Sequence, residues 1–234
     1  MNEGWLSMAH WRSALRDPGL RLLLASVLVA VAALTSVAFF ADRVERALLL
    51  QGAALMAADL VVEQGEVIPQ AWLDKADSLG LRSARSISFP SVIVAGERPL
   101  LVQVKAVESP YPLRGRLRID TPDGEVGQAP APGEAWLEGR LRNRLDVDIG
   151  TSEIQLGETR LRAAGILRDE PDRGGNLFQL APRLMISYRD ALQSGLLGPA
   201  SRVKYRFLMA GDAGQIASMR TWLACRLKPG SGLA

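Results

Sequence analysis

Residues that commonly carry out chemistry are scarce in this sequence. It holds one histidine, His10, and one cysteine, Cys225, so no intrachain disulfide can form. A lone cysteine neither supports nor excludes an exported compartment. His10 precedes a long apolar run, whereas the segments with the pattern of a folded domain follow it. Histidine-assisted nucleophilic catalysis and a Cys–His zinc site are therefore excluded for the domain.

The short motifs of the large enzyme classes are also missing: there is no GxSxG, no P-loop and no GxGxxG. Asp169, Glu170 and Asp172 form an acidic cluster, but their spacing does not match an EF-hand loop. We expect no catalytic residue, no cofactor and no metal ligand, and interpret the chain as non-enzymatic. Carboxylate-only hydrolysis remains an alternative that no motif supports.

The sequence has no long block of like charges. The net charge is +3, and the arginines alternate with Asp and Glu over most of the chain. This distribution is typical of a solvated surface, so we expect no nucleic-acid partner.

What the sequence does have is a long uncharged run, Leu22–Phe40. Its roughly 19 residues would reach about 28 Å as a helix, close to the hydrocarbon thickness of a bilayer. We predict a transmembrane helix over 20–41. A signal peptide is the alternative, because Ser36-Val37-Ala38 resembles a cleavage site, although the run exceeds the usual apolar length of such peptides.

The segment before the run, 1–19, is predicted to be an amphipathic helix at the membrane surface. Trp5 and Trp11 share one apolar stripe that arginines flank. Arg12 and Arg16 are candidates for contact with lipid headgroups or with a partner subunit; a solvated face is the alternative. The excess of arginines before the run weakly favours a cytoplasmic N-terminus.

After Phe40 charged residues appear without any Gly or Pro, and the residues are strong helix formers. We predict that the helix leaves the bilayer and continues as a stalk over 42–58, with an apolar stripe that includes Leu48. A stalk continuous with a membrane span is a mechanical design. Leu48 is therefore a candidate coupling position.

Beyond the stalk the pattern changes to a mixture of strands and short helices, which indicates an α+β domain over 59–227 followed by an exit loop, 228–234. A β-rich insertion is predicted over 108–168. The predicted elements are strands at 59–63, 86–94, 100–107, 153–156, 159–167 and 203–209 and helices at 69–79 and 213–227, with a short strand and helix over 135–145. Pro90 predicts an edge or a bulge.

Two segments invite a functional interpretation. Arg114, Arg116 and Arg118 alternate with apolar or small residues, which favours the wet face of a strand over a phosphate site. The Gly-rich EPDRGGNLFQL segment contains Arg173 and Phe178. We interpret it as a functional loop with apolar side chains beside it; the alternative is a buried loop whose Phe178 packs in the core.

Several stretches in order resemble one known family. They are WRSALRDPGLRLLLASVLVAVAALTSVAFFADRVERAL, IPQAWLDKADSLGLRSARSISFPSVIVAG, VQVKAVESPYPLRGRLRI, EPDRGGNLFQLAPRLM and GPASRVKYRFLMAG. Together they are similar to permease subunits of the MacB/FtsX-type ABC transporters, in the YbbP-like branch. The resemblance covers nearly the whole chain, from about Trp11 to Leu227.

The resemblance implies an inner-membrane protein with a cytoplasmic N-terminus and a MacB-like periplasmic α+β domain. It also implies a separate cytoplasmic ATP-binding subunit, whose ATP-driven closure moves the stalk and the domain (mechanotransmission). Lipid-like or hydrophobic cargo and a periplasmic esterase are the further partners it suggests, besides membrane lipids. With a transporter implied, the loop with Arg173 and Phe178 is expected to contact that cargo or a sister domain.

Because such permeases are longer and have further spans, the chain is expected to be their N-terminal part, a fragment or a truncated product. Two alternatives stay open. One is a single-span membrane protein whose extracytoplasmic domain binds a ligand or partner; the other is a secreted or anchored enzyme.

Overall fold

The computed structural model describes residues 18–121, 124–125, 129–173, 181–198, 202–227 and 232–233. The chain divides into two compact units, 1–50 and 51–234. The first helix, α2, runs without interruption from Pro18 to Met56, and its 39 residues extend from the first unit into the start of the second.

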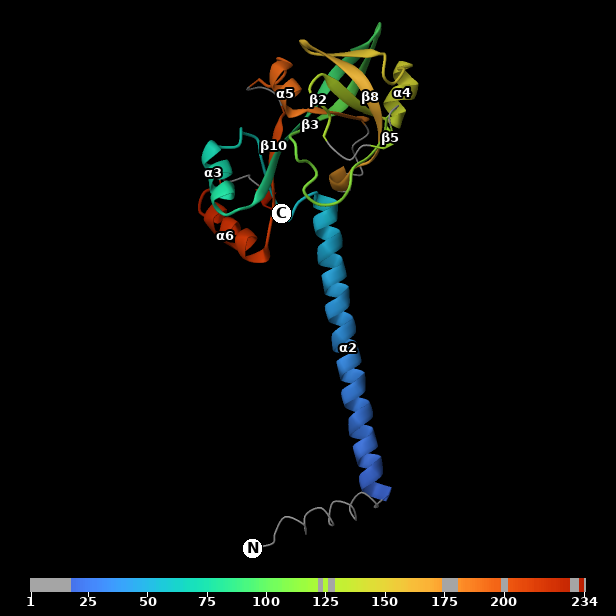
Figure 1. The fold of residues 1–234 in the computed structure, drawn as a ribbon, viewed down its shortest axis with the longest axis vertical. Coiled ribbons are helices and arrows are strands. Elements are labelled where there is room, and N and C mark those ends of the chain that lie inside the picture. The colour runs from blue at the N-terminus through green and yellow to red at the C-terminus, as the bar shows by residue number, and fades with distance from the viewer. Residues whose placement is uncertain are drawn as a thin grey trace. The chain divides into compact units, whose positions relative to one another are not determined.

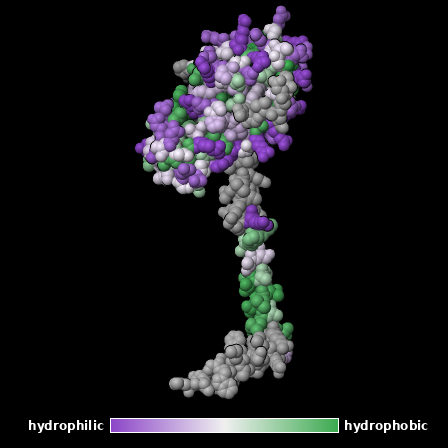
Figure 2. Space-filling model, viewed as in Figure 1, coloured by the Kyte–Doolittle hydropathy of each residue, from purple (hydrophilic) through white to green (hydrophobic). Residues whose placement is uncertain are grey.

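The N-terminal half of α2 is apolar all round. Leu22–Phe40 is long and apolar enough to cross a membrane, and none of it is buried within the protein; Figure 2 shows this part of the helix as a continuous hydrophobic segment. Two of its three hydroxyl groups are satisfied locally, because the hydroxyls of Ser26 and Thr35 donate to helix carbonyls 2.8 and 2.7 Å away. Such internal pairing suits a helix surrounded by lipid.

The first charged turn after this run stays close to the apolar surface. The Arg43 guanidinium lies 5.5 Å from the centroid of the Phe39 ring, a cation–π distance. An arginine that packs its stem and head against an apolar helix face while it reaches toward water is common at membrane interfaces.

The second unit is built on one mixed sheet, part of which is labelled in Figure 1. Its strand order is β11-β1-β10-β2-β3-β9-β6-β8-β4-β5. The pairs β3–β9 and β6–β8 are parallel and the other pairs antiparallel. The strands are β1 (Leu60–Gln64), β2 (Arg82–Ala95), β3 (Arg98–Val107), β4 (Arg118–Thr121), β5 (Gly124–Glu125), β6 (Glu134–Glu138), β7 (Glu153–Leu156), β8 (Thr159–Asp169), β9 (Arg183–Ser187), β10 (Lys204–Ala210) and β11 (Gly232–Leu233).

Strand β7 closes part of the sheet on itself. It pairs with β8 on one side and with the end of β2 on the other, so β2, β3, β9, β6, β8 and β7 form a continuous ring. Closure removes exposed strand edges at this end of the domain. The ring encloses small and aliphatic side chains, among them Ile93, Leu137 and Ile154, all fully buried.

Helices cover one face of the sheet, and loops cover the other. The helices α3 (Gln70–Ser78), α4 (Gly139–Leu145), α5 (Tyr188–Gln193) and α6 (Ala213–Ala224) bury their apolar residues in the larger core. The smaller core, on the opposite face, is closed by the segment 108–117, which contributes Tyr111, Leu113 and Leu117. Alternate residues of β3 therefore face different cores, with Val104 and Ala106 toward the helices.

The predicted strands and helices of the domain are confirmed, with small shifts at their ends. Pro90 lies inside β2, and the pairing of β2 with β3 continues through it without a shift in register. On the other side of β2, the pairing with β10 ends at Ser88 and the pairing with β7 begins at Ile93. The proline thus occupies a locally unpaired edge, where its missing N–H costs no ladder bond.

The predicted strand through Arg114 is wrong: only Arg118 is in a strand, and Arg114 lies in a loop and pairs with Asp59.

Candidate functional site: the helix exit and a buried ion cluster

The point where α2 gives way to the domain is held by backbone hydrogen bonds. Ala57 follows the helix with a left-handed backbone (φ 62°), and its carbonyl oxygen accepts from the N–H of Leu113 at 3.0 Å and of Arg114 at 2.9 Å. A residue in this conformation ends a helix and turns the chain. Here the two N–H groups come from the segment 108–117, which we name the strap.

Asp59 adds a charged contact at the helix exit. Its carboxylate accepts from the Arg114 side chain at 2.8–3.0 Å and from the backbone N–H of Gly211 at 3.1 Å. Burial raises the pKa of Asp59, but the hydrogen bonds from Arg114 and Gly211 outweigh it, so the pKa lies below its ordinary value. The Arg82 guanidinium also donates to the Leu113 carbonyl, at 3.2 Å.

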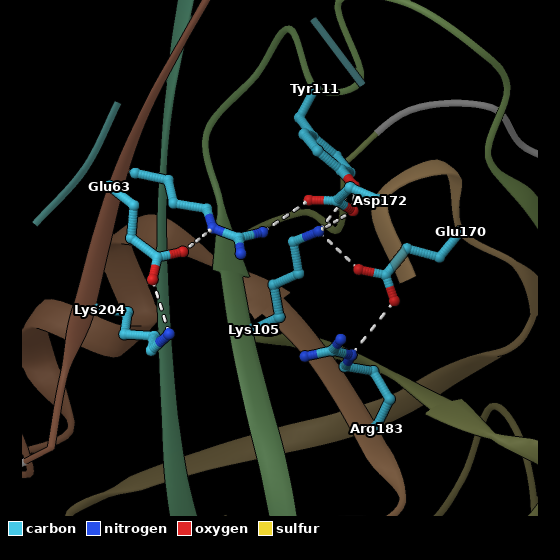
Figure 3. A network of polar contacts seen from close by, with 8 residues as sticks. Glu63, Lys105, Tyr111, Glu170, Asp172, Arg183 and Lys204 are labelled. Atoms are coloured by element: carbon cyan, nitrogen blue, oxygen red, sulfur yellow. Dashed lines mark hydrogen bonds and ion pairs between the residues drawn. The ribbon is translucent and has the colours of Figure 1, made fainter. Parts of the chain in front are cut away.

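A few residues along the strap, Tyr111 enters a cluster of buried charges (Figure 3). The Lys105 ammonium donates to the Tyr111 hydroxyl at 2.8 Å, to Glu170 at 2.5 Å and to Asp172. The Tyr111 hydroxyl in turn donates to Asp172 at 2.6 Å. The side chains of Lys105, Glu170 and Asp172 are 2%, 0% and 6% exposed, so their charges are stabilised by one another rather than by water.

Three further strands contribute charged residues to the cluster. Arg183 of β9 lies 3.2 Å from Glu170, an ion-pair distance, although the geometry is not that of a hydrogen bond. Arg206 of β10 lies 3.4 Å from Asp172 and donates to Glu63 of β1 at 2.7 Å. Glu63 also accepts from Lys204 at 2.6 Å. The cluster therefore joins β1, β3, β9 and β10 to the strap and to the short 3-10 helix η1 (Pro171–Arg173).

The ionisation states follow from this pairing. Burial raises the pKa of Asp172, but the Lys105 charge and the hydrogen bonds from Lys105 and Tyr111 outweigh it and lower the pKa to about 2. Burial and the neighbouring carboxylates hold the pKa of Tyr111 well above its ordinary value. The tyrosine therefore stays a neutral hydrogen-bond donor and Asp172 stays a carboxylate at physiological pH.

This chemistry is structural rather than catalytic. Each carboxylate is paired with at least one cation of the protein, Lys105 for Asp172 and both Lys105 and Arg183 for Glu170, which disfavours a role as a general base or nucleophile. Within the described ranges no group of His, Cys, Asp and Glu is arranged to hold a metal ion. An open cleft of about 460 Å³ lies elsewhere, between the β2–β3 turn and the residues after α4, and its Glu97, Arg98 and Asp146 have mixed charge.

Of the five site residues expected from the sequence, only Leu48 and Arg173 belong to described helices. Arg12, Arg16 and Phe178 lie outside the described residues. Leu48 belongs to α2, and Arg173 ends η1 directly after Asp172. The structure does not test their proposed contacts, so these remain predictions.

Sequence reasoning missed Lys105, Tyr111 and Arg183 as partners. The acidic cluster at 169–172 was visible, but only as a poor metal site. The available signal was Lys105 itself, a charge inside the apolar strand VQVKAV, since a charge at such a position needs a buried partner.

Comparison with known proteins gives a consistent assignment. No family model matches the chain. Its sequence is 36% identical over 219 residues to the uncharacterized ABC transporter permease YbbP of Escherichia coli (strain K12), a match that covers 94% of this chain and 26% of that permease. The chain is a relative of the permease YbbP. It spans about a quarter of the length of that protein.

The fold of this YbbP relative has solved counterparts. The periplasmic region of MacB from Actinobacillus actinomycetemcomitans superposes with a TM-score of 0.52 and 10% identity, covering 80% of this chain and 92% of that one. The extracellular domain of the noncanonic ABC-type transporter YknZ from Gram-positive bacteria gives a TM-score of 0.48 and 10% identity, over 75% and 99% of the two chains. The expected MacB-like α+β fold is confirmed. Together with the apolar helix, the similarity to a permease supports an inner-membrane protein with a periplasmic domain.

Proposed function

We propose that this chain is the N-terminal part of an ABC transporter permease that converts ATP hydrolysis in the cytoplasm into motion of a periplasmic domain. The observation that carries the proposal is the unbroken helix α2. Its 39 residues span about 58 Å, roughly twice the hydrocarbon thickness of a bilayer. The membrane run ends at Phe40, so about four further turns continue the same helix up to Met56.

A helix that serves only as an anchor has no need to continue beyond the membrane. Continuity matters because every residue within the helix is tied to its neighbours by i→i−4 hydrogen bonds, which make the rod stiff along its axis. The helix exit is in turn bonded to the strap, which donates to the Ala57 carbonyl and to the Asp59 carboxylate. A displacement of the membrane end is thus passed to the domain instead of being absorbed by a flexible linker.

The partners follow from the same proposal. An ATP-binding subunit in the cytoplasm supplies the stroke, the N-terminus faces that subunit, and Arg12 and Arg16 contact it or the lipid headgroups. The cargo is hydrophobic or lipid-like, and a periplasmic esterase acts on it after extraction. The relationship to an ABC transporter permease supports the ATP-binding subunit; the cargo and the esterase are proposed from the family resemblance alone.

The test uses the full-length permease, purified together with the ATP-binding subunit and reconstituted in liposomes. A donor dye on the exposed Cys225 and an acceptor on lipid headgroups report the distance between the domain and the bilayer. We expect ATP to change the energy transfer and to release a fluorescent lysophospholipid from the same vesicles. A permease that binds no ATP-binding subunit, or whose energy transfer ignores ATP, would refute the proposal. Motion without lysophospholipid release would refute only the lipid-like cargo.

A further inference from the structure

We infer that the strap (108–117) is the part that transmits load between the exit of α2 and the sheet, and that Tyr111 is the pin that fixes it. The inference rests on the proposed function, because it names the residues through which the helix would move the domain. Its observations all lie within the second compact unit.

The strap is bonded both to the helix exit and to the ion cluster. Leu113 and Arg114 donate to the Ala57 carbonyl, and Arg114 also binds Asp59, so the helix exit is held by a bidentate ion pair and two backbone bonds. Only one residue separates Leu113 from Tyr111, whose hydroxyl lies in the ion cluster. A link this short has little slack.

The strap is also stiff between these points. Pro110 and Pro112 flank Tyr111, and proline fixes its own φ and restricts the residue before it. Tyr111 and Leu113 are 2% and 4% exposed in the smaller core, so the link is packed as well as bonded. Packed side chains transmit displacement because protein interiors are dense and scarcely compressible.

At its far end the pin reaches the body of the sheet. Tyr111 shares its hydrogen bonds with Lys105 of β3 and with Asp172. Through Glu170 and Arg206 the same cluster continues to β9, β10 and β1. A push on the helix exit is therefore spread over four strands. Without the pin it would act on the short covalent link from Ala57 to β1, where backbone rotation could absorb it.

The first part of the test measures the stability of the hydrogen bonds between the strap and the helix exit, and does not depend on transport. Hydrogen exchange is followed at the amides of Leu113 and Arg114 in the full-length permease. Tyr111→Phe removes the hydroxyl that binds Lys105 and Asp172. Asp59→Asn weakens the ion pair with Arg114 at the helix exit and leaves the ion cluster intact. The matched control is Arg168→Gln, which breaks an exposed ion pair with Asp120 on another part of the domain.

We expect both variants to speed exchange at these amides by about fivefold or more, the factor expected for loss of an ordinary hydrogen bond, and the control to leave it unchanged. Protected amides in Tyr111→Phe would overturn the inference. Should Tyr111→Phe fail to fold, Asp59→Asn decides the same question, and protected amides there overturn it equally.

The second arm measures the ATP-dependent energy transfer from Cys225. Tyr111→Phe should keep ATP hydrolysis but reduce the change in energy transfer to less than about half of that in wild type and in Arg168→Gln, since the joint yields once the pin is lost. A full-sized change in Tyr111→Phe would overturn the strap's role while leaving the proposed function intact. A flat signal in the wild-type permease would refute the proposed function itself, and the inference with it.

Discussion

Lys105 has an environment that few lysines occupy. Its ammonium is removed from water and contacts two carboxylates and a phenol, in a strand whose neighbouring residues are apolar. Desolvation of each ion costs several kcal/mol, and mutual attraction with good hydrogen bonds offsets that cost. The cluster therefore adds little net stability as a set, but the loss of any one member leaves an uncompensated charge.

Replacement of Lys105 by methionine should destabilise the chain by about 3–5 kcal/mol, because Glu170 and Asp172 are left buried without their cation. Denaturant unfolding, followed by tryptophan fluorescence, measures the effect. Arg168→Gln is the control, and should cost at most about 1 kcal/mol as an exposed pair. The triple variant Lys105→Met, Glu170→Gln, Asp172→Asn should recover part of the loss. Equal stabilities of Lys105→Met and the control would show that the cluster is not desolvated.

Because the pKa of Asp172 is lowered in the folded protein, we expect the stability to depend on pH. This pKa is lowered from 3.8 to about 2 in the folded protein, so the unfolded chain binds the proton more readily. The stabilisation is present above about pH 4 and is lost as the pH falls toward 2. The free energy of unfolding, measured from pH 5 to 2.5, should fall more steeply in the wild type than in Asp172→Asn. Parallel curves would contradict the pairing with Lys105.

Individual residues also show where sequence reasoning stopped. The period-two pattern correctly placed Lys105 in a strand, but its carboxylate partners are 65 and 67 residues away along the chain. Arg114 was misassigned because its alternation with small residues mimics a strand, whereas its partner Asp59 is 55 residues away. The charge of Lys105 in an apolar strand indicates that a buried partner is needed, but the local sequence identifies the partner of neither residue.

At the scale of elements, tight turns decide how the strands meet. Gly157, between β7 and β8, has φ +54°, and a Cβ there would lie 2.2 Å from the Ser194 carbonyl oxygen. Gly96, between β2 and β3, has φ +60° but no atom within 4 Å of the same position. The two glycines therefore share a backbone conformation and differ in their surroundings.

Gly96→Ala should cost about 1–2 kcal/mol, the strain of a left-handed residue. Gly157→Ala should cost clearly more, because the backbone of the β7–β8 turn or of the segment after α5 must move as well. Denaturant unfolding of the two variants side by side gives the difference. The same loss in both would mean that the turn and the Ser194 segment separate without cost.

The helix α2 is the element on which coupling depends. Leu48→Pro removes one helix hydrogen bond and kinks the rod, at about 3 kcal/mol, whereas Leu48→Ala keeps the helix. In the reconstituted permease the proline variant should hydrolyse ATP without changing the energy transfer from Cys225, and the alanine variant should behave like wild type. Normal energy transfer in Leu48→Pro would argue against mechanical coupling through this helix.

Over the whole molecule, hydrophobic periodicity predicted most strands and helices in their order, and the α+β class followed from it, but β9 and α5 were not predicted. The closed ring through β7 and the two cores on opposite faces of the sheet were not. They depend on pairings such as Ile93 with Leu156, which join segments far apart in sequence. Periodicity predicts which residues face a core, but not which of two cores they enter.

The chain's relationship to YbbP covers about a quarter of that permease. At this scale the claim that matters most is that α2 crosses the bilayer and carries the domain on the side opposite to the N-terminus. The two alternatives differ from it: a helix buried in a soluble fold would leave both ends in one compartment, and a cleaved signal peptide would remove the residues before Leu22 from the mature chain.

Labelling of the full-length permease in intact cells with a membrane-impermeant maleimide tests this directly. The native Cys225 is exposed on the domain, and Ser7→Cys supplies a site before the apolar run. Cys225 should react once the outer membrane is permeable, and the cysteine of Ser7→Cys only after the inner membrane is opened as well. Reaction of both sites at the same step would contradict a membrane-crossing α2.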